Sequence, residues 1–156
     1  MNLKIELIRD NIIIPALTEI NSYTDDAADM VLVSGAAESL YGDVRQRGGG
    51  PALSWWQIEP RTHDDIWRNY LGITRRQHLL DGLQRLSTRP GLSHELEANP
   101  WYAAAMCRIF YLRISERLPR AGDRPAQAAY WKKYYNTAAG KGTIGGFLEK
   151  VNTCLA

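Results

Sequence analysis

The sequence predicts a mainly α-helical single domain over residues 1–156. Hydrophobic residues recur at helical spacing along most of the chain, whereas the alternation typical of a half-buried strand is weak. With 156 residues, of which 45% are apolar and 23% charged, the chain can build one sizeable core. No repeat or linker divides it, so we expect one helical body with at most a small hairpin within residues 43–58.

Three helices are expected in the first forty residues. Residues 3–14 form the first, and Pro15 suits the opening turn of a second. The apolar face of the first helix consists of Leu3, Leu7, Ile8 and Ile12. Thr24, followed by two aspartates, is a good N-cap for a third helix that ends near Leu40, with Gly42 as its stop.

Five more helices are expected after a loop at residues 43–60. Thr62 and Thr74 are the expected starts of two of them. Pro100 opens the segment "PWYAAAMCRIFYLRI", which is apolar on nearly every face and therefore predicts the central buried helix. The last two helices cover residues 124–136 and 143–154.

Composition and charge exclude several classes of protein. A net charge of +2 is too small to indicate nucleic-acid binding, and no apolar run approaches the roughly 20 residues of a membrane span. The start, "MNLKIELIRDNIIIPAL", is interrupted by charges and unlike a signal peptide, so we expect synthesis in the cytoplasm. Cys107 lies in an apolar run, which predicts a buried free thiol.

The sequence offers no recognisable metal or cofactor site. The three histidines, His63, His78 and His94, lack metal-ligand spacing. The segment "AAGKGT" is not a phosphate loop, because Gly142 separates the lysine from the threonine and no glycine stands five residues before Gly140. We therefore expect a function that needs no cofactor.

Glu38 is the candidate catalytic residue. It follows "VLVSGAA" at the end of an expected helix, where the negative end of the helix dipole and apolar neighbours both raise a carboxyl pKa. A glutamic acid that stays protonated near neutral pH can donate a proton to a leaving oxygen. On position alone, a solvated glutamate at a helix end is the simpler interpretation.

Three motifs around Glu38 resemble the lytic transglycosylases, a superfamily shared with goose-type lysozymes. The first is Glu-Ser at a helix end, here Glu38-Ser39. The second is a loop Gly-Ala-x-Gly-Leu-x-Gln followed by a hydrophobic residue and a proline. Here "GPALSWWQIEPRT" matches it at Ala52, Gln57, Ile58, Pro60 and Thr62. The third is Ala-Tyr-Asn-x-Gly, here Tyr135-Asn136 within "KKYYNTAAGKG".

The motifs span about residues 28–142 in the family's order and resemble its bacteriophage-encoded branch. The resemblance implies a lysozyme-like fold for the single domain. The chain also departs from the pattern. Ser54 replaces a glycine, Trp55-Trp56 replaces two smaller apolar residues, and three residues instead of one separate Asn136 from Gly140. These departures concern substrate contacts more than the acid.

The resemblance implies cleavage of the β-1,4 bond between N-acetylmuramic acid and N-acetylglucosamine in peptidoglycan. Glu38 protonates the glycosidic oxygen and then, as a carboxylate, takes the proton of the muramoyl 6-hydroxyl, which closes a 1,6-anhydro ring. A second catalytic carboxylate is then not obligatory, unlike in most glycosidases. Tyr135 is implied to hydrogen-bond and orient Glu38.

The remaining site residues of this prediction bind substrate. They are Ser39, Trp55, Trp56, Gln57 and Asn136. The glycines at 48–50 would let the loop backbone approach the sugar, and the tryptophans would stack on it. The alternative is that one tryptophan belongs to the core, and that Tyr135 is a packed aromatic at a helix end.

Two rivals to a transglycosylase stay open. Asp43 or Glu59 is a candidate second acid that would position a water and make the protein a hydrolase; Asp64 and Asp65 suit a helix start instead. A structural virion protein with this fold and no activity is the other. The expected partners are glycan strands and other virion proteins, with the protein carried by the virion to the periplasm and cell wall, or released through a membrane lesion.

Overall fold

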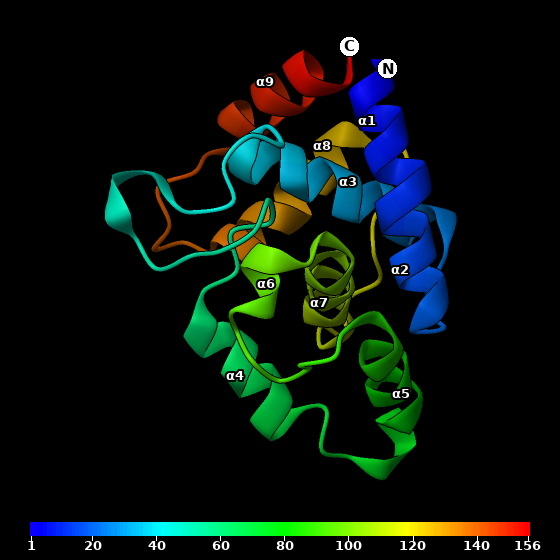
Figure 1. Ribbon diagram of the computed structural model, residues 1–156. Helices are drawn as coiled ribbons and strands as arrows, with labels where there is room; N and C mark the ends of the chain where they lie inside the picture. The colour runs from blue at the N-terminus through cyan, green and yellow to red at the C-terminus, as the bar shows by residue number, and fades with distance from the viewer.

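The computed structural model describes residues 1–156 apart from the side chain of Arg47, and the mainly α-helical fold is confirmed. The α-helices are α1 (Leu3–Ile8), α2 (Ile14–Glu19), α3 (Asp25–Ser39), α4 (Pro60–Asn69), α5 (Gln77–Leu86), α6 (Glu95–Ala98), α7 (Pro100–Leu112), α8 (Arg124–Tyr130) and α9 (Ile144–Leu155) (Figure 1). Two π-helical turns, Arg9–Ile13 and Trp131–Asn136, and two 3-10 turns, Arg47–Gly49 and Thr74–Arg76, complete the helical segments.

The central buried helix is α7, as the sequence predicts. Pro100 opens it, and the side chain of Asn99 caps it by accepting a hydrogen bond of 3.0 Å from the backbone N–H of Tyr102. The run from Tyr102 to Cys107 has no exposed surface. The other helices surround α7, with α4 and α5 on one side and α3 and α9 on the other (Figure 1).

Helix α3 crosses the core and delivers Glu38 to the surface. Thr24 caps it, accepting from the N–H of Ala27 at 3.0 Å, and buried residues occupy every position from Met30 to Ala37. The helix ends at Ser39 because Leu40 takes the left-handed conformation with φ 55°, so the expected stop at Gly42 lies two residues too late.

The N-terminal helix is one rod made of α1, a π-turn and α2. Pro15 has no N–H to donate to the carbonyl of Asn11, and that carbonyl instead accepts the indole N–H of Trp101 at 2.8 Å. The predicted apolar face is wrong in part, because Leu3 and Leu7 are 70% and 49% exposed. The π-turn rotates the helix, and the buried face consists of Ile5, Ile8, Ile13, Ala16 and Leu17.

The segment 43–60 contains no sheet. Leu53 forms isolated antiparallel bridges to Arg45 and to Ile58, which is all that remains of the expected hairpin. Helix α4 begins at Pro60 and not at Thr62, because a proline at the first position needs no hydrogen-bond acceptor. Helix α5 follows the expected Thr74 only after a 3-10 turn.

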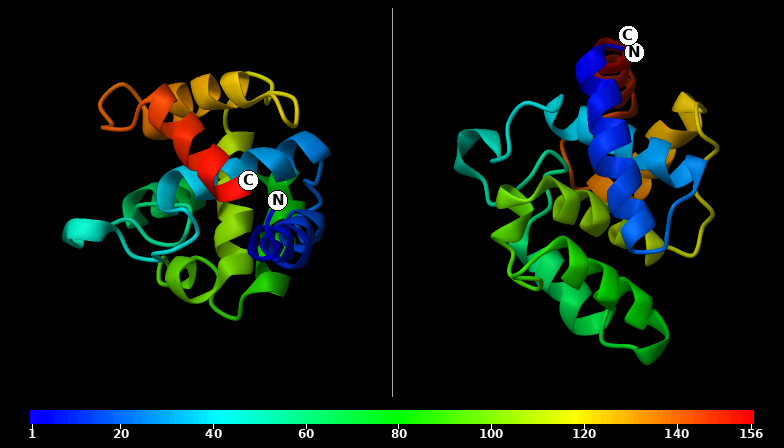
Figure 2. Two further views of the ribbon diagram at one scale, coloured as in Figure 1. Left: turned by 90° about the horizontal axis from the view of Figure 1, so that it is seen from above. Right: turned by 45° about the vertical axis from the view of Figure 1, so that its right-hand side comes forward.

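The last helices agree with the prediction. Helix α8 with its π-turn covers residues 124–136, and α9 is capped by Thr143, whose hydroxyl accepts from Gly146 at 2.9 Å. Both cysteines are buried free thiols, as expected for Cys107. The two ends of the chain lie side by side (Figures 1 and 2), where Asn2 donates to the carbonyl of Cys154 at 3.0 Å.

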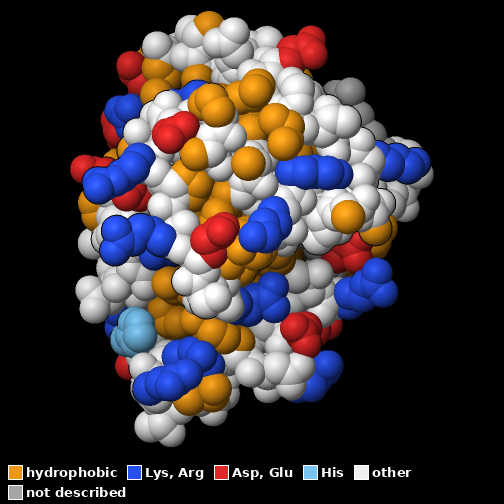
Figure 3. Space-filling view, turned by 180° about the vertical axis from the view of Figure 1, so that it is seen from behind, with side chains coloured by type: hydrophobic (Ala, Val, Ile, Leu, Met, Phe, Trp, Pro, Cys, Tyr) orange, Lys and Arg blue, Asp and Glu red, His pale blue; other side chains and the backbone are white. Residues whose placement is uncertain are grey.

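Two loops project beyond the C-terminal end of α3. They are residues 43–51 and 137–143, drawn in cyan and orange in the view from above (Figure 2). Seen from behind the view of Figure 1, the molecule carries interspersed Lys, Arg, Asp and Glu side chains around separate hydrophobic patches (Figure 3). Glu38 therefore lies at the end of the molecule where long loops leave the helical body.

Candidate active site around Glu38

The carboxyl group of Glu38 is fixed by an indole. Trp131 Nε1 donates a hydrogen bond of 2.9 Å to Oε1 of Glu38. Trp131 begins the π-turn after α8, and its ring is 97% buried, since only 3% of the residue is exposed. An indole N–H can only donate, so Oε1 is the accepting oxygen and the acidic proton of a protonated Glu38 sits on Oε2.

Burial raises the pKa of Glu38 from 4.5 to about 7. Two favourable interactions of the charged form oppose this rise: the hydrogen bond from Trp131 and the positive charge of Lys150. The carboxyl is thus half protonated near neutral pH, as a proton donor that later acts as a base requires. The expectation of a raised pKa rested on the helix end and on burial, and burial is the cause of the rise in the structure.

Trp131 is locked in place from two sides. Its ring packs on Phe147 of α9 with centroids 5.2 Å apart. A Cβ at Gly142 would come within 2.5 Å of the ring, so only glycine fits there. Trp131 was not predicted as a site residue, because a tryptophan in a helical run is typical of a hydrophobic core. Its partner, Glu38, lies 93 residues away in the sequence.

Lys150 joins the site from α9. Its ammonium group donates a hydrogen bond of 3.1 Å to the carbonyl of Ala37, one of the last carbonyls of α3. A cation at this place offsets the partial negative charge of the helix end, and it lowers the pKa of Glu38. Lys150 was not predicted as a site residue either, because it belongs to none of the three motifs around Glu38.

Glu38 opens into a pocket of about 310 Å³. The lining consists of Glu38, Ser39, Leu40, Asp43, Arg45, Gln46, Gln57 and Lys150. The structure thus brings the helix end together with both ends of the loop at residues 43–57. A further wall is Lys150 of α9, and within the described residues the segment 135–140, which holds the third motif, does not line the pocket.

Unusual backbone conformations gather next to Glu38. Non-glycine residues with positive φ are Asn21, Leu40, Tyr41, Ser54, Gln57 and Thr137. Four of these six fall between residues 40 and 57, and each costs of order 1 kcal/mol or more. The loop is held in place all the same: Ser54 accepts the N–H of Trp56 at 3.1 Å, and Gln57 Nε2 donates to the Ser54 carbonyl at 2.7 Å. Strain of this kind clusters at functional sites.

Ser39 and Gln57 are the predicted substrate-binding residues that reach the pocket. Ser39 accepts the backbone N–H of Tyr41 at 3.2 Å and thereby fixes the turn that follows α3. Tyr41 then folds back over Gly35, where a Cβ would come within 2.4 Å of the tyrosine ring. The glycines at 48–50 are not among the lining residues, although Gly48 and Gly49 need their positive φ of 79° and 81°.

The expected hydrogen bond between Tyr135 and Glu38 is wrong. The hydroxyl of Tyr135 donates to the backbone carbonyl of Trp56, and its ring packs on Phe110 with centroids 4.7 Å apart. Burial is the main cause that raises the pKa of Tyr135, and the negative charge of Glu38 adds to the rise, so the two groups are close. Tyr135 therefore holds the loop beside the acid, while Trp131 holds the acid itself.

Neither tryptophan of the pair faces Glu38, which corrects the expected stacking platform. Trp56 has no exposed surface and donates to the carbonyl of Val31 at 2.8 Å, so it is the core member of the pair. Trp55 is half-buried and lines an apolar groove on the side of α1. Ring packing on Tyr41 at 5.5 Å holds it there.

Two further predicted residues lie away from the pocket lining. Asn136 accepts from Lys132 Nζ at 2.8 Å and packs so tightly on the following loop that Gly140 and Gly142 cannot carry a Cβ. Glu59 pairs with Arg61 at 3.2 Å and does not line the pocket. Of the two candidate second acids, only Asp43 shares the pocket with Glu38.

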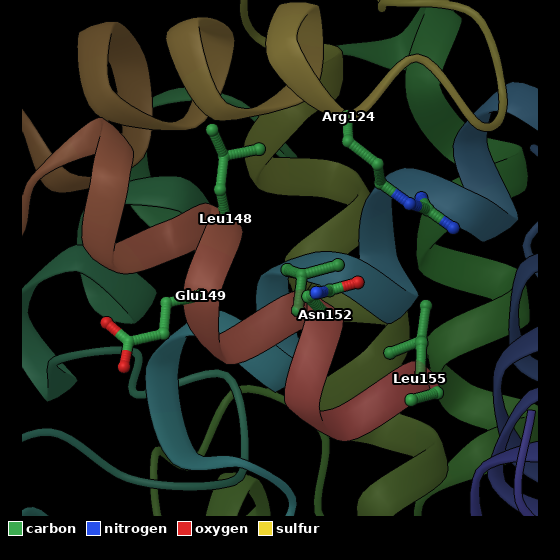
Figure 4. Close-up of a pocket in the computed structure, with 7 residues that line it drawn as sticks. Arg124, Leu148, Glu149, Asn152 and Leu155 are labelled. Atoms are coloured by element: carbon green, nitrogen blue, oxygen red, sulfur yellow. The ribbon is translucent and has the colours of Figure 1, made fainter.

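A second cavity, of about 520 Å³, lies between α8 and α9 (Figure 4). Arg124 enters it from α8, but its guanidinium is bound to Asp29 at 2.8 Å. The carboxylate of Glu149 points away from Arg124 (Figure 4). This larger cavity therefore lacks a positioned acid, and the smaller pocket at Glu38 is the better candidate for chemistry.

No family model, no curated protein and no solved structure matches the chain. Across the described residues, no helix is long and apolar enough to cross a membrane, and no group of three His, Cys, Asp or Glu residues forms a metal site. The fold and the site together define a mainly helical protein with one perturbed carboxyl in an open pocket.

Proposed function

We propose that this protein is a lytic transglycosylase that cleaves peptidoglycan between N-acetylmuramic acid and N-acetylglucosamine. The observation that carries the proposal is Glu38, whose pKa lies at about 7 in a pocket of about 310 Å³. Trp131 occupies Oε1, which leaves the protonated Oε2 for the glycosidic oxygen of a bound strand.

The sequence resemblance supports the same function. The Glu-Ser pair ends a helix, and the second motif forms the loop that walls the pocket at Gln57. Ser54 stands where the family pattern has a glycine, and it adopts a left-handed conformation with φ 71° that glycine favours. The substitution thus preserves the backbone shape that the motif requires.

The proposed reaction uses Glu38 twice. Protonated Glu38 gives its proton to the leaving oxygen as the glycosidic bond breaks, and the positive charge that develops on the sugar is stabilised by the new carboxylate. The carboxylate then takes the proton of the muramoyl 6-hydroxyl while that oxygen bonds to the anomeric carbon. Lys150 stabilises the transient carboxylate, and the product is a 1,6-anhydro sugar. No water is consumed.

A hydrolase is the second candidate, since Asp43 lines the same pocket as Glu38. In an inverting glycosidase the two carboxyl groups flank a water molecule, and one of them acts as its base.

The resemblance to bacteriophage enzymes supports a role in the virion, where the protein would open the cell wall during genome entry. A role in host lysis fits the hydrolase equally.

Clearing of a suspension of purified peptidoglycan tests the proposal. Wild type should clear it, and Glu38→Gln should lower the rate by roughly 10²–10⁴-fold or more. The matched control is Glu59→Gln, a carboxylate outside the pocket, which should keep full activity. A wild-type protein that clears nothing would point to a structural virion protein, and an active Glu38→Gln would remove Glu38 from the reaction.

The products separate the two enzymes. A transglycosylase releases muropeptides that lack a reducing end and weigh one water less than hydrolysis products. Mass spectrometry of the digest should find the anhydro form. If reducing muropeptides were the main product, the protein would be a hydrolase and not a transglycosylase. Asp43→Asn should then abolish activity, as Glu38→Gln does.

A further inference from the structure

Three arginines line another pocket, which lies at the opposite end of α3 from Glu38 and is distinct from the cavity between α8 and α9. The pocket has a volume of about 290 Å³ and is lined by Thr24, Asp26, Arg108, Arg117, Leu118 and Arg120. Thr24 caps the start of α3, so the partial positive charge of this helix end adds to that of the guanidinium groups. The pocket lies about 21 Å from Glu38, given 1.5 Å per residue of helix.

Arg117 and Arg120 belong to the strap, which is the segment of residues 113–123 between α7 and α8. The strap is held at both ends. Tyr130 donates to the carbonyl of Glu116 at 3.0 Å. At the other end, the backbone N–H of Ala121 donates to Asp26 at 2.8 Å, and the next N–H donates to Asp29 at 2.7 Å. Both panels of Figure 2 show this strap, in yellow, running beside the start of α3. The two arginines are thus displayed from a fixed backbone.

Arg108 reaches the pocket from α7 and is half-buried. Its Nε donates to the carbonyl of Ser22 at 3.0 Å, which fixes the plane of the guanidinium. Burial lowers the pKa of Arg108, and the groups that act against this are a thiol and two phenols, not a carboxylate. A partly buried guanidinium without a carboxylate partner is an incomplete arrangement that an anion would complete.

The acids near the pocket are already engaged. Asp26 accepts from the strap, Asp25 accepts from Tyr23 at 2.6 Å, and Glu116 faces Lys133 at 3.6 Å. Among the side chains that the structure describes, none forms an ion pair with Arg108, Arg117 or Arg120. Among the lining residues, three guanidinium groups face the one carboxylate of Asp26, so the lining has an excess of two positive charges, which match a doubly charged anion.

We propose that Arg108, Arg117 and Arg120 form a binding site for a dianionic phosphate group, on a free small molecule or on a phosphate-bearing polymer. Guanidinium groups bind phosphate oxygens through paired hydrogen bonds, and three of them from two elements surround a tetrahedral anion better than a flat carboxylate. The site is separate from the pocket at Glu38, so the proposal is independent of the proposed catalytic function.

Isothermal titration calorimetry with inorganic phosphate at pH 8, where it is mainly the dianion, tests the site. Wild type should bind one equivalent, with a dissociation constant in the micromolar to low millimolar range. The double variant Arg117→Gln/Arg120→Gln should weaken binding by about tenfold or more, because each lost pair of charge-assisted hydrogen bonds is costly. Both side chains are exposed, so the variant should fold. The control variant is Arg75→Gln, an exposed arginine on the 3-10 turn before α5.

Each outcome decides the proposal. Equal binding by wild type and the double variant, or equal weakening by Arg75→Gln, would mean general charge attraction and would overturn it. Wild type that binds no inorganic phosphate at about 10 mM would overturn it as well. A parallel titration with short-chain polyphosphate identifies the source: much tighter binding that still depends on Arg117 and Arg120 indicates a polymer, and equal binding per site indicates a small molecule. Peptidoglycan clearing by the double variant should stay unchanged.

Discussion

The indole N–H of Trp131 and the carboxyl group of Glu38 meet at 2.9 Å, although 93 residues separate them in the sequence. This one contact joins the end of α3 to the π-turn after α8. It decides which carboxyl oxygen carries the proton, and it favours the ionised form against the effect of burial. The carboxyl group of Glu38 and its partner therefore depend on the packing of three helices, α3, α8 and α9.

Trp131→Phe should raise the pKa of Glu38 further and lower the activity. Phenylalanine keeps a ring against Phe147 but has no N–H, so the hydrogen bond that lowers the pKa disappears. We expect kcat to fall roughly tenfold, because the carboxyl group is no longer held in position. The alkaline limb of the pH profile should move to higher pH. The measurement is the rate of clearing from pH 5 to 9. A lower rate with an unmoved limb would mean that the indole has only a packing role.

Lys150→Met should also move the alkaline limb to higher pH. The ammonium group lowers the pKa of Glu38, so its removal keeps the acid protonated over a wider range. Because Lys150 is exposed, we expect a shift of only about 0.3–1 pH unit, and it should shrink in high salt. Arg75→Gln removes one positive charge far from the site and should leave the profile in place. A limb that moves downward would contradict this account.

Glu38→Gln should stabilise the protein at alkaline pH. Because the folded pKa of about 7 lies above the ordinary 4.5, the contribution of Glu38 to stability is complete below about pH 4.5 and is lost as the pH rises through 7. Glutamine has no charge to desolvate and still accepts from Trp131. We expect a gain of about 1–3 kcal/mol at pH 8 and none near pH 4.5. Urea unfolding at several pH values measures it, and a constant difference would exclude this cause.

Gly35→Ala should destabilise the fold and disturb the pocket. A Cβ at Gly35 would meet the ring of Tyr41 at 2.4 Å, and Tyr41 is anchored by a hydrogen bond of 2.6 Å to the carbonyl of Leu32. We expect a loss of about 1–3 kcal/mol in the free energy of unfolding. The matched control is Gly145→Ala in α9, where nothing lies within 4 Å, and it should stabilise by about 0.5 kcal/mol. Similar effects of the two changes would refute the steric argument.

The sequence predicts the helices well because their signals are local. Thr24 as a cap, Pro100 as a helix start and the apolar run of α7 each act within one turn, and all three are confirmed. The predicted face of the first helix was wrong in part: Ile8 is buried, but Leu3 and Leu7 are exposed, and the π-turn at Arg9–Ile13 brings Ile13 onto the buried face. Periodicity alone cannot anticipate a change of helical type.

The candidate site was predicted only in part. Glu38, Ser39 and Gln57 belong to short motifs, and the structure brings all three to one pocket. Trp131 and Lys150 reach Glu38 through tertiary packing and carry no local signal. Trp131, and not the expected Tyr135, donates a hydrogen bond to Glu38. The tyrosine hydroxyl has one proton and donates it to the backbone carbonyl of Trp56. Which aromatic residue meets an acid depends on how helices pack, which spacing does not encode.

The proline in the N-terminal helix has a consequence for the order of assembly during synthesis. The carbonyl of Asn11 receives its hydrogen bond from Trp101, 90 residues later in the chain. When residues 1–20 have left the ribosome, neither this donor nor the α7 surface that packs on α2 has been made. The N-terminal segment therefore emerges with its proline and π-turn unsupported, and it becomes a stable rod only after the centre of the molecule has been translated.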